Sequence, residues 1–106
     1  MIDAARVFQA LGDATRRDMV ERLNEKPMSV SALASPYAMS LTAVGQHLAV
    51  LEAAGLVTTA KQGRVRTVHA ARPGLEILRS WLDARRSPLE KSLDALGDML
   101  AEDDEA

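Results

Sequence analysis

The sequence of 106 residues predicts a single domain that is mainly α-helical and carries one small β-hairpin. Apolar residues recur at helical spacing over most of the chain, whereas two short stretches between residues 56 and 70 are β-prone. A turn that contains glycine separates these two stretches, as expected for a hairpin. The chain is 47% hydrophobic but has one Phe, one Trp and one Tyr, so an aliphatic core is expected.

The first part of the chain predicts two short helices. Residues 3–11 are expected to form an apolar helix that ends at Gly12. Asp13 is then expected to cap a second helix over residues 14–24, because its carboxylate can accept a free backbone N–H of the first turn. In this second helix the inward residues should be Met19, Val20 and Leu23.

A third helix is expected to be short. Ser29 can cap it, and it would include Val30, Leu33 and Ala34. Pro36 disfavours helical geometry at the residue before it, so the helix should end there.

The clearest helical pattern in the chain begins after Ser40 and ends before Gly55. Val44, Leu48 and Leu51 fall at i, i+4 and i+7, so they should line one side of a helix. The Ser40 hydroxyl can cap the first backbone N–H groups, and Gly55 can adopt the positive φ that often ends a helix.

The opposite side of this helix carries short or amide-type polar groups and no acid before Glu52 in the last turn. Such a side suits the major groove of DNA, because no carboxylate repels phosphate. The amide of Gln46 can pair with a base edge, and Thr42 can contact a thymine methyl. The alternative is an ordinary amphipathic helix of a small bundle. The residues predicted to face the bases are Ser40, Thr42, Ala43, Gln46 and His47.

A basic hairpin is predicted after this helix. Residues 56–60 and 65–70 form its strands, and Gly63 lies in the turn where a positive φ is needed. Two helices with a tight linker, followed by such a hairpin, make a winged helix-turn-helix. Lys61, Arg64 and Arg66 are predicted to contact DNA phosphates; the alternative is a hairpin that only closes the core and has solvated charges.

Arg16, in the first turn of the second helix, is a further possible phosphate contact. The alternative is a side chain that is solvated or paired with a neighbouring acid.

The C-terminal part predicts two more helices. One follows Arg72 and extends through Arg86, and the other starts at Ser87-Pro88. A single copy of this small fold has too little apolar surface to cover the apolar sides of both the first and the last helix. A two-fold interface between two copies is therefore predicted to cover them. The alternative is packing within one chain. The predicted interface residues are Val7, Phe8, Leu11, Leu89, Leu93, Leu96 and Leu100.

The predicted domain thus has three functional regions. Residues 14–70 form the DNA-binding core, residues 1–12 and 74–101 contribute the dimerisation helices, and residues 102–106 form an acidic, frayed tail.

The charge of the chain is unevenly distributed. A net charge of −2 and a pI near 5.6 argue against bulk binding of nucleic acid. However, residues 40–72 carry four basic residues and one acid, a net charge of +3, whereas residues 83–106 carry a net charge of −5. Only the first of these segments would face phosphate.

Several function classes are excluded or disfavoured. The absence of Cys excludes disulfides, thiolate metal sites and cysteine nucleophiles. There is no signal pattern and no long apolar run, so a cytoplasmic protein without membrane contact is expected. No catalytic constellation and no phosphate loop is present, so neither an enzyme nor a cofactor is expected.

The chain resembles the ArsR family of winged-helix transcriptional regulators. The matching segments are FQALGDATRRDMVERL at 8–23, SLTAVGQHLAVLEAAGLV at 40–57 and GRVRTVH at 63–69. The resemblance implies a homodimer built on the first and last helices, which binds an inverted repeat at a promoter, usually as a repressor. Family members often carry Lys or Arg where this chain has Ala49, and Ser where it has Gly45, so two possible DNA contacts are missing.

The resemblance also bears on metals. Many members sense metals through Cys pairs in the helix that precedes the DNA-reading helix, which corresponds here to the helix between Ser40 and Gly55. Others use His and carboxylates in the last helix. Neither set is present here, and His47 and His69 lie on different elements. The chain is more similar to the cysteine-free branch, so no metal site is expected.

Two other functions remain open at this point. The chain could be a protein-interaction module that keeps a winged-helix core, or a regulator that responds to an unidentified small molecule. The first predicts no affinity for the duplex upstream of its own gene and a monomer that dimerises only weakly, and the second needs a pocket.

Overall fold

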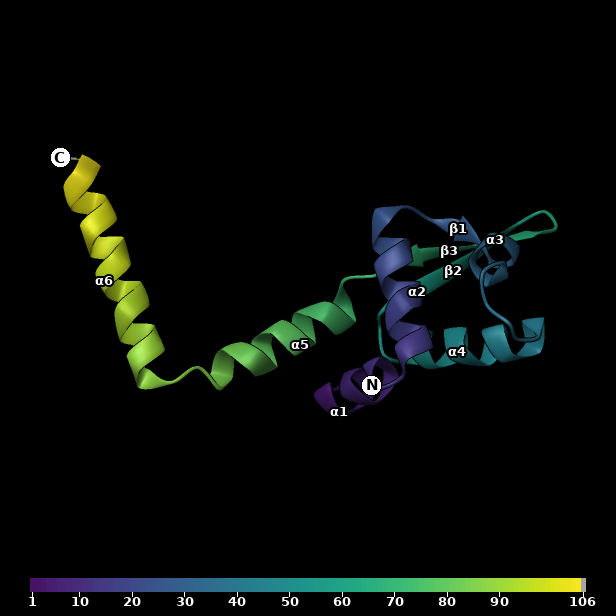
Figure 1. Ribbon diagram of the computed structural model, residues 1–106, viewed down its shortest axis with the longest axis horizontal. Coiled ribbons are helices and arrows are strands. Elements are labelled where there is room, and N and C mark those ends of the chain that lie inside the picture. Colours follow the sequence, from purple (N-terminus) through teal and green to yellow (C-terminus); the bar gives the residue numbers. More distant parts are fainter. Residues whose placement is uncertain (106) are drawn as a thin grey trace.

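The computed structural model describes residues 1–105, with side chains described for residues 1–101 (Figure 1). The helices are α1 (Ala4–Leu11), α2 (Ala14–Glu25), α3 (Val30–Ala34), α4 (Leu41–Ala53), α5 (Pro73–Ala84) and α6 (Pro88–Glu105). The strands are β1 (Met28–Ser29), β2 (Val57–Gln62) and β3 (Val65–Ala70). This arrangement confirms the predicted fold class, a mainly helical winged helix-turn-helix. The fraying expected at 102–106 falls on residues whose side chains lie outside this description.

The helix starts follow from side-chain caps. Asp13, Ser29 and Ser40 each accept the backbone N–H three residues ahead, at 3.0, 3.1 and 3.1 Å. These contacts confirm the three predicted caps, since each satisfies an N–H that has no partner within its helix. Asp3 caps α1 in the same way, at 2.9 Å.

The sheet has three antiparallel strands in the order β1-β3-β2, one more than the predicted hairpin. The additional strand is only two residues long, and it pairs Met28 with Val68 and Ser29 with Thr67. It attaches the segment before α3 to the hairpin, so the helix-turn-helix and the hairpin share one sheet. Gly63 in the turn has a φ of +64°, as the sequence predicts. We refer to the β2–β3 hairpin as the wing.

The core is aliphatic and lies between the helices and the sheet. It includes the residues predicted to face inward on α2 and α4. One member corrects the sequence analysis, because Val7 is completely buried inside the protomer and offers no surface to a second copy. The buried residues of the core are Val7, Ala10, Met19, Val20, Leu23, Leu33, Val44, Leu48, Leu51, Ala54, Leu56, Val57 and Val68.

A close backbone contact joins the end of α4 to the start of α5. Gly55 has a φ of +70°, and its carbonyl accepts the N–H of Gly74 at 2.8 Å. A Cβ on Gly74 would lie 2.4 Å from the carbonyl oxygen of Ala54, so only glycine fits. This contact fixes where the C-terminal helices leave the winged-helix core.

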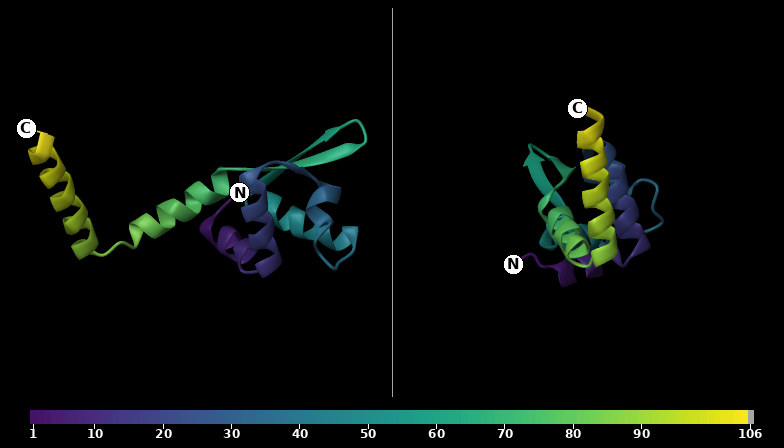
Figure 2. Two further views of the ribbon diagram at one scale, coloured as in Figure 1. Left: turned by 45° about the horizontal axis from the view of Figure 1, so that its top comes forward. Right: turned by 90° about the vertical axis from the view of Figure 1, so that its left-hand side faces the viewer.

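The last helix projects away from the rest of the molecule (Figures 1 and 2). The protomer is elongated, with extents of 58 × 29 × 26 Å. The four leucines of α6 that were predicted to lie in a dimer interface form an apolar seam along the helix, and they are between 51% and 68% exposed. Packing of this seam within one chain is therefore not what the structure shows.

Among the described helices, none combines the length and the apolar character that a membrane crossing requires.

Candidate nucleic-acid interface

The start of α4 and the tip of the wing lie at one end of the molecule, and α6 lies at the other (Figures 1 and 2). The acidic C-terminal part is therefore far from the face on which the predicted DNA contacts gather. The side of α4 that carries Val44, Leu48 and Leu51 is buried in the core, so its opposite side is free to face a ligand.

The predicted base-facing residues divide into two groups. Thr42 and Gln46 are exposed on the outer side of α4. Ala43 and His47 are half-buried on the flank of the helix that faces α2. Ser40 is exposed at the start of the helix, where its hydroxyl is used as the cap. The centre of the outer side is thus formed by Thr42 and Gln46.

The three wing cations, Lys61, Arg64 and Arg66, are exposed. Within the described part of the chain, none of them forms an ion pair with an acid. Lys61 and Arg66 are directly opposite each other across the β2–β3 ladder. Like charges at such a position destabilise the pair of strands, and an anion between them would relieve the repulsion. The wing therefore carries positive charge that no acid among the described side chains neutralises.

A groove runs between α4 and the wing. Arg66 lines it from the wing, and Gly45, Ala49 and Glu52 line it from α4. A Cβ on Gly45 would meet nothing within 4 Å, so this helical glycine is not required by packing inside the protomer. Because Gly45 and Ala49 are small, the side of α4 that faces Arg66 is open. Glu52 is the acidic residue on that side of α4.

Arg16 makes contacts within the protomer that neither alternative from the sequence included. Its Nε donates to the carbonyl of Ala10 at 2.7 Å, and its Nη2 donates to the carbonyl of Gln9 at 3.1 Å. Its Nη1 lies 3.2 Å from Nδ1 of His47. The guanidinium thus connects the end of α1 to α4. Sequence reasoning missed this role because the partners are backbone carbonyls and a residue 31 positions away.

Asp13 lies at the same junction. The backbone N–H of Arg16 donates to its carboxylate and lowers the pKa of Asp13, and the nearby charge of Arg16 acts in the same direction. Burial has an opposing effect. The carboxylate is therefore held in its charged form at the start of α2, where the helix dipole also favours an anion.

The helix α1, which carries three of the predicted dimer residues, packs against α5. Phe8 is 41% exposed and packs edge-on against Trp81, with ring centroids 4.8 Å apart. Leu11 is half-buried and packs against the core. Leu82 of α5 is also exposed, at 53%, so α1 and α5 each present an apolar side chain to solvent.

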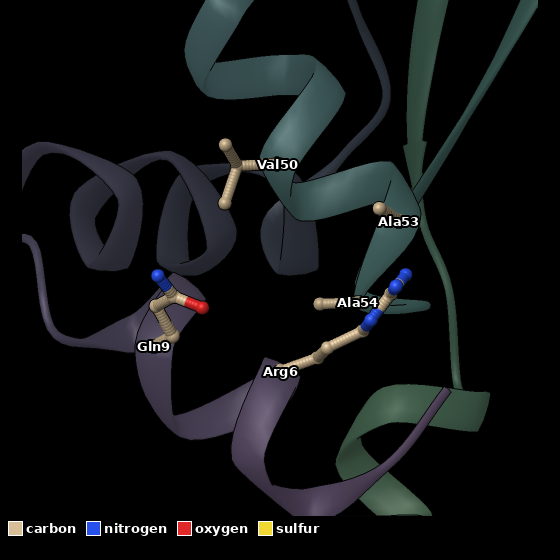
Figure 3. A pocket seen from close by; sticks show the side chains of 5 residues that line it. All are labelled: Arg6, Gln9, Val50, Ala53 and Ala54. Carbon is tan, nitrogen blue, oxygen red and sulfur yellow. The ribbon is translucent and has the colours of Figure 1, made fainter. Parts of the chain in front are cut away.

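A shallow pocket of about 270 Å³ lies between α1 and the last turns of α4 (Figure 3). Arg6 and Gln9 line it from α1, and the apolar side chains of Val50, Ala53 and Ala54 line it from the end of α4. In the described part of the chain every buried side-chain nitrogen and oxygen has a hydrogen-bond partner. No buried polar group of the pocket therefore calls for a ligand.

The described residues contain no cluster of three or more His, Cys, Asp or Glu side chains that could hold a metal ion.

Comparison with known proteins identifies the family. The family described as "Helix-turn-helix domain" matches residues 5–60. The HTH-type transcriptional regulator Rv2034 of Mycobacterium tuberculosis (strain ATCC 25618 / H37Rv) is 45% identical over 78 residues, which cover 74% of this chain and 73% of that protein.

Solved structures agree with this result. The crystal structure of an ArsR family transcriptional regulator is 40% identical, has a TM-score of 0.73, and covers 76% of this chain and 84% of its own. An ArsR-like transcriptional regulator from Rhodococcus sp. RHA1 is 31% identical, with a TM-score of 0.72 over 92% of this chain and 90% of its own. The chain belongs to the ArsR family of winged helix-turn-helix transcriptional regulators, which bind double-stranded DNA.

Proposed function

We propose that this chain binds an inverted-repeat operator as a homodimer and represses transcription from the promoter that contains it. Residues 14–70 of each protomer would bind one half-site. Helices from residues 1–12 and 74–101 would hold the two copies together. Repression would follow because a dimer on the promoter blocks access by RNA polymerase.

The observation that carries this proposal is the combination of α4 and the wing at one end of the molecule. Thr42 and Gln46 are exposed on a helix side that has no acid before Glu52 in its last turn. The adjacent hairpin carries three cations that form no ion pair among the described residues. We assign α4 to the major groove, where an amide side chain can read a base edge. We assign Lys61, Arg64 and Arg66 to backbone phosphates, which contribute affinity but no sequence choice.

The dimer is supported by the apolar side chains that a single protomer leaves uncovered. Leu89, Leu93, Leu96 and Leu100 are more than half exposed on α6, and Met99 beside them is 61% exposed. Exposed apolar side chains that recur along one helix are typical of interaction sites. A second copy supplies the same surface by two-fold symmetry, which also matches the symmetry of an inverted repeat.

The direct test is selection of duplexes from a random pool by the full chain, followed by sedimentation of the protein alone and with the selected duplex. We expect an enriched inverted repeat and a complex of two chains per duplex. A reporter that carries the selected sequence in its promoter should then be silenced when the chain is expressed. Enrichment of no sequence, or binding of one chain to an asymmetric site, would refute the proposal.

A further inference from the structure

One side chain joins three helices at the edge of the candidate interface. Arg16 lies in the first turn of α2, and its guanidinium donates to the carbonyls of Gln9 and Ala10 in α1. Its third contact is with Nδ1 of His47 on α4, at 3.2 Å from Nη1. Arg16 and His47 are both half-buried, so these contacts are partly shielded from water.

The chemistry of this contact determines where the imidazole proton is. A guanidinium has five N–H donors and no acceptor, so the ring nitrogen that faces it must offer a lone pair. In a neutral imidazole the proton is then on the other nitrogen, and the hydrogen bond of one nitrogen thereby sets the role of the other. His47 should therefore carry its proton on Nε2.

We propose that Arg16 is a positioning residue for sequence readout, which holds His47 on the reading helix with its Nε2–H as a hydrogen-bond donor toward the duplex. This inference rests on the proposed function, in which α4 reads the major groove. A donor at this position would favour acceptors such as guanine N7 and O6 or thymine O4. His47 could then distinguish base pairs, whereas a ring that exchanges between tautomers could donate or accept.

The neighbouring residue Arg17 provides a matched control. Its Nη1 also donates to a carbonyl at the end of α1, that of Leu11, at 2.5 Å. Unlike Arg16, it has no contact with His47 among the hydrogen bonds of the described residues. Arg17→Gln therefore removes the same charge and a similar link to α1, but leaves the His47 contact in place.

The first experiment measures the tautomer by ¹⁵N NMR of the two imidazole rings in the full chain without DNA. His69, the only other histidine in the sequence, serves as an internal reference. We expect His47 to be in the Nε2–H form in the wild type and in Arg17→Gln, and to be a mixture of forms in Arg16→Gln, because an amide can donate or accept. A wild-type ring protonated on Nδ1, or an equal mixture, would overturn the inference, and this measurement needs no variant to fold.

The second experiment compares binding of the strongest selected duplex with binding of a random duplex of equal length. We expect Arg16→Gln and His47→Ala each to lower this preference about five- to tenfold, the range of one lost hydrogen bond. The double variant should lose no more than His47→Ala alone, since both changes remove the same interaction. Additive losses, or an unchanged preference in Arg16→Gln, would overturn the inference.

The two experiments separate the inference from the proposed function. If the wild type prefers no duplex, the proposed function fails, and with it the readout role of Arg16, whatever the tautomer shows. If the wild type selects a duplex but the tautomer is wrong, the proposed function stands and only the role of Arg16 fails.

Discussion

The exposed wing cations lead to a quantitative prediction for the salt dependence of DNA binding. Each protomer presents Lys61, Arg64 and Arg66 without an acidic partner in the described chain. Each phosphate that a cation neutralises contributes about −0.9 to the slope of log K against log salt. If all six cations of a dimer are engaged, the slope is about −5. Affinity should then fall roughly 10³-fold between about 50 and about 200 mM salt.

The variant Arg64→Ala tests the contribution of one position in each wing. Removal of two phosphate contacts per dimer should change the slope by about +2, and specific and random duplexes should be weakened alike. Lys91→Ala is the control, because it removes an equal charge from α6 at the opposite end of the molecule (Figure 1). Fluorescence anisotropy titrations at several salt concentrations measure all three slopes. The reasoning would be refuted by a shallow wild-type slope, or by equal slopes for wild type and Arg64→Ala.

Four further predictions concern single residues. Gln46→Ala should relax sequence choice by about 1–3 kcal/mol at one base pair, with little loss on random duplex, as read by binding to single-base variants of the selected site. Gly45→Ala should raise the free energy of unfolding by about 1 kcal/mol, because the added Cβ meets nothing within 4 Å. Gly74→Ala should lower the free energy of unfolding, because the added Cβ would lie 2.4 Å from a carbonyl oxygen. Thermal melts in which both variants shift Tm in the same direction would contradict this pair of predictions. The pKa of Asp13 is lowered in the folded state, so its charge stabilises the fold above about pH 4. This contribution is lost as the pH falls through the lowered pKa. The difference in Tm between wild type and Asp13→Asn should therefore shrink as the pH falls below about 4. Leu96→Glu should weaken self-association without loss of helix content, since Leu96 is 51% exposed in the protomer. Sedimentation velocity measures self-association and circular dichroism measures helix content. Unchanged self-association, or a loss of helix content, would contradict this prediction.

Local features of this fold were predictable from the sequence. The limits of α4 follow from a serine cap, three apolar residues at helical spacing and a glycine that adopts a positive φ. The wing follows from two β-prone stretches and a glycine turn. In each case neighbouring residues determine the backbone conformation, so the signal is contained within one segment.

The features that the sequence did not predict depend on contacts between distant segments. Strand β1 is two residues long and exists because Met28 pairs with Val68, so it has no periodicity of its own. Val7 lies on the predicted apolar side of α1, but which part of that side is buried depends on how α1 packs against α2, α4 and α5. The Arg16–His47 contact likewise joins residues that only the tertiary fold brings together.

The most direct test of the central claim is hydroxyl-radical footprinting of the selected duplex by the full chain. Two α4 helices related by a two-fold axis should protect two symmetric segments, with centres about 10 base pairs apart or a multiple of this distance. We predict such a pair of protected segments on one face of the duplex, and their loss together in Arg64→Ala at moderate salt. A single protected segment, or two segments on opposite faces of the duplex, would contradict the account.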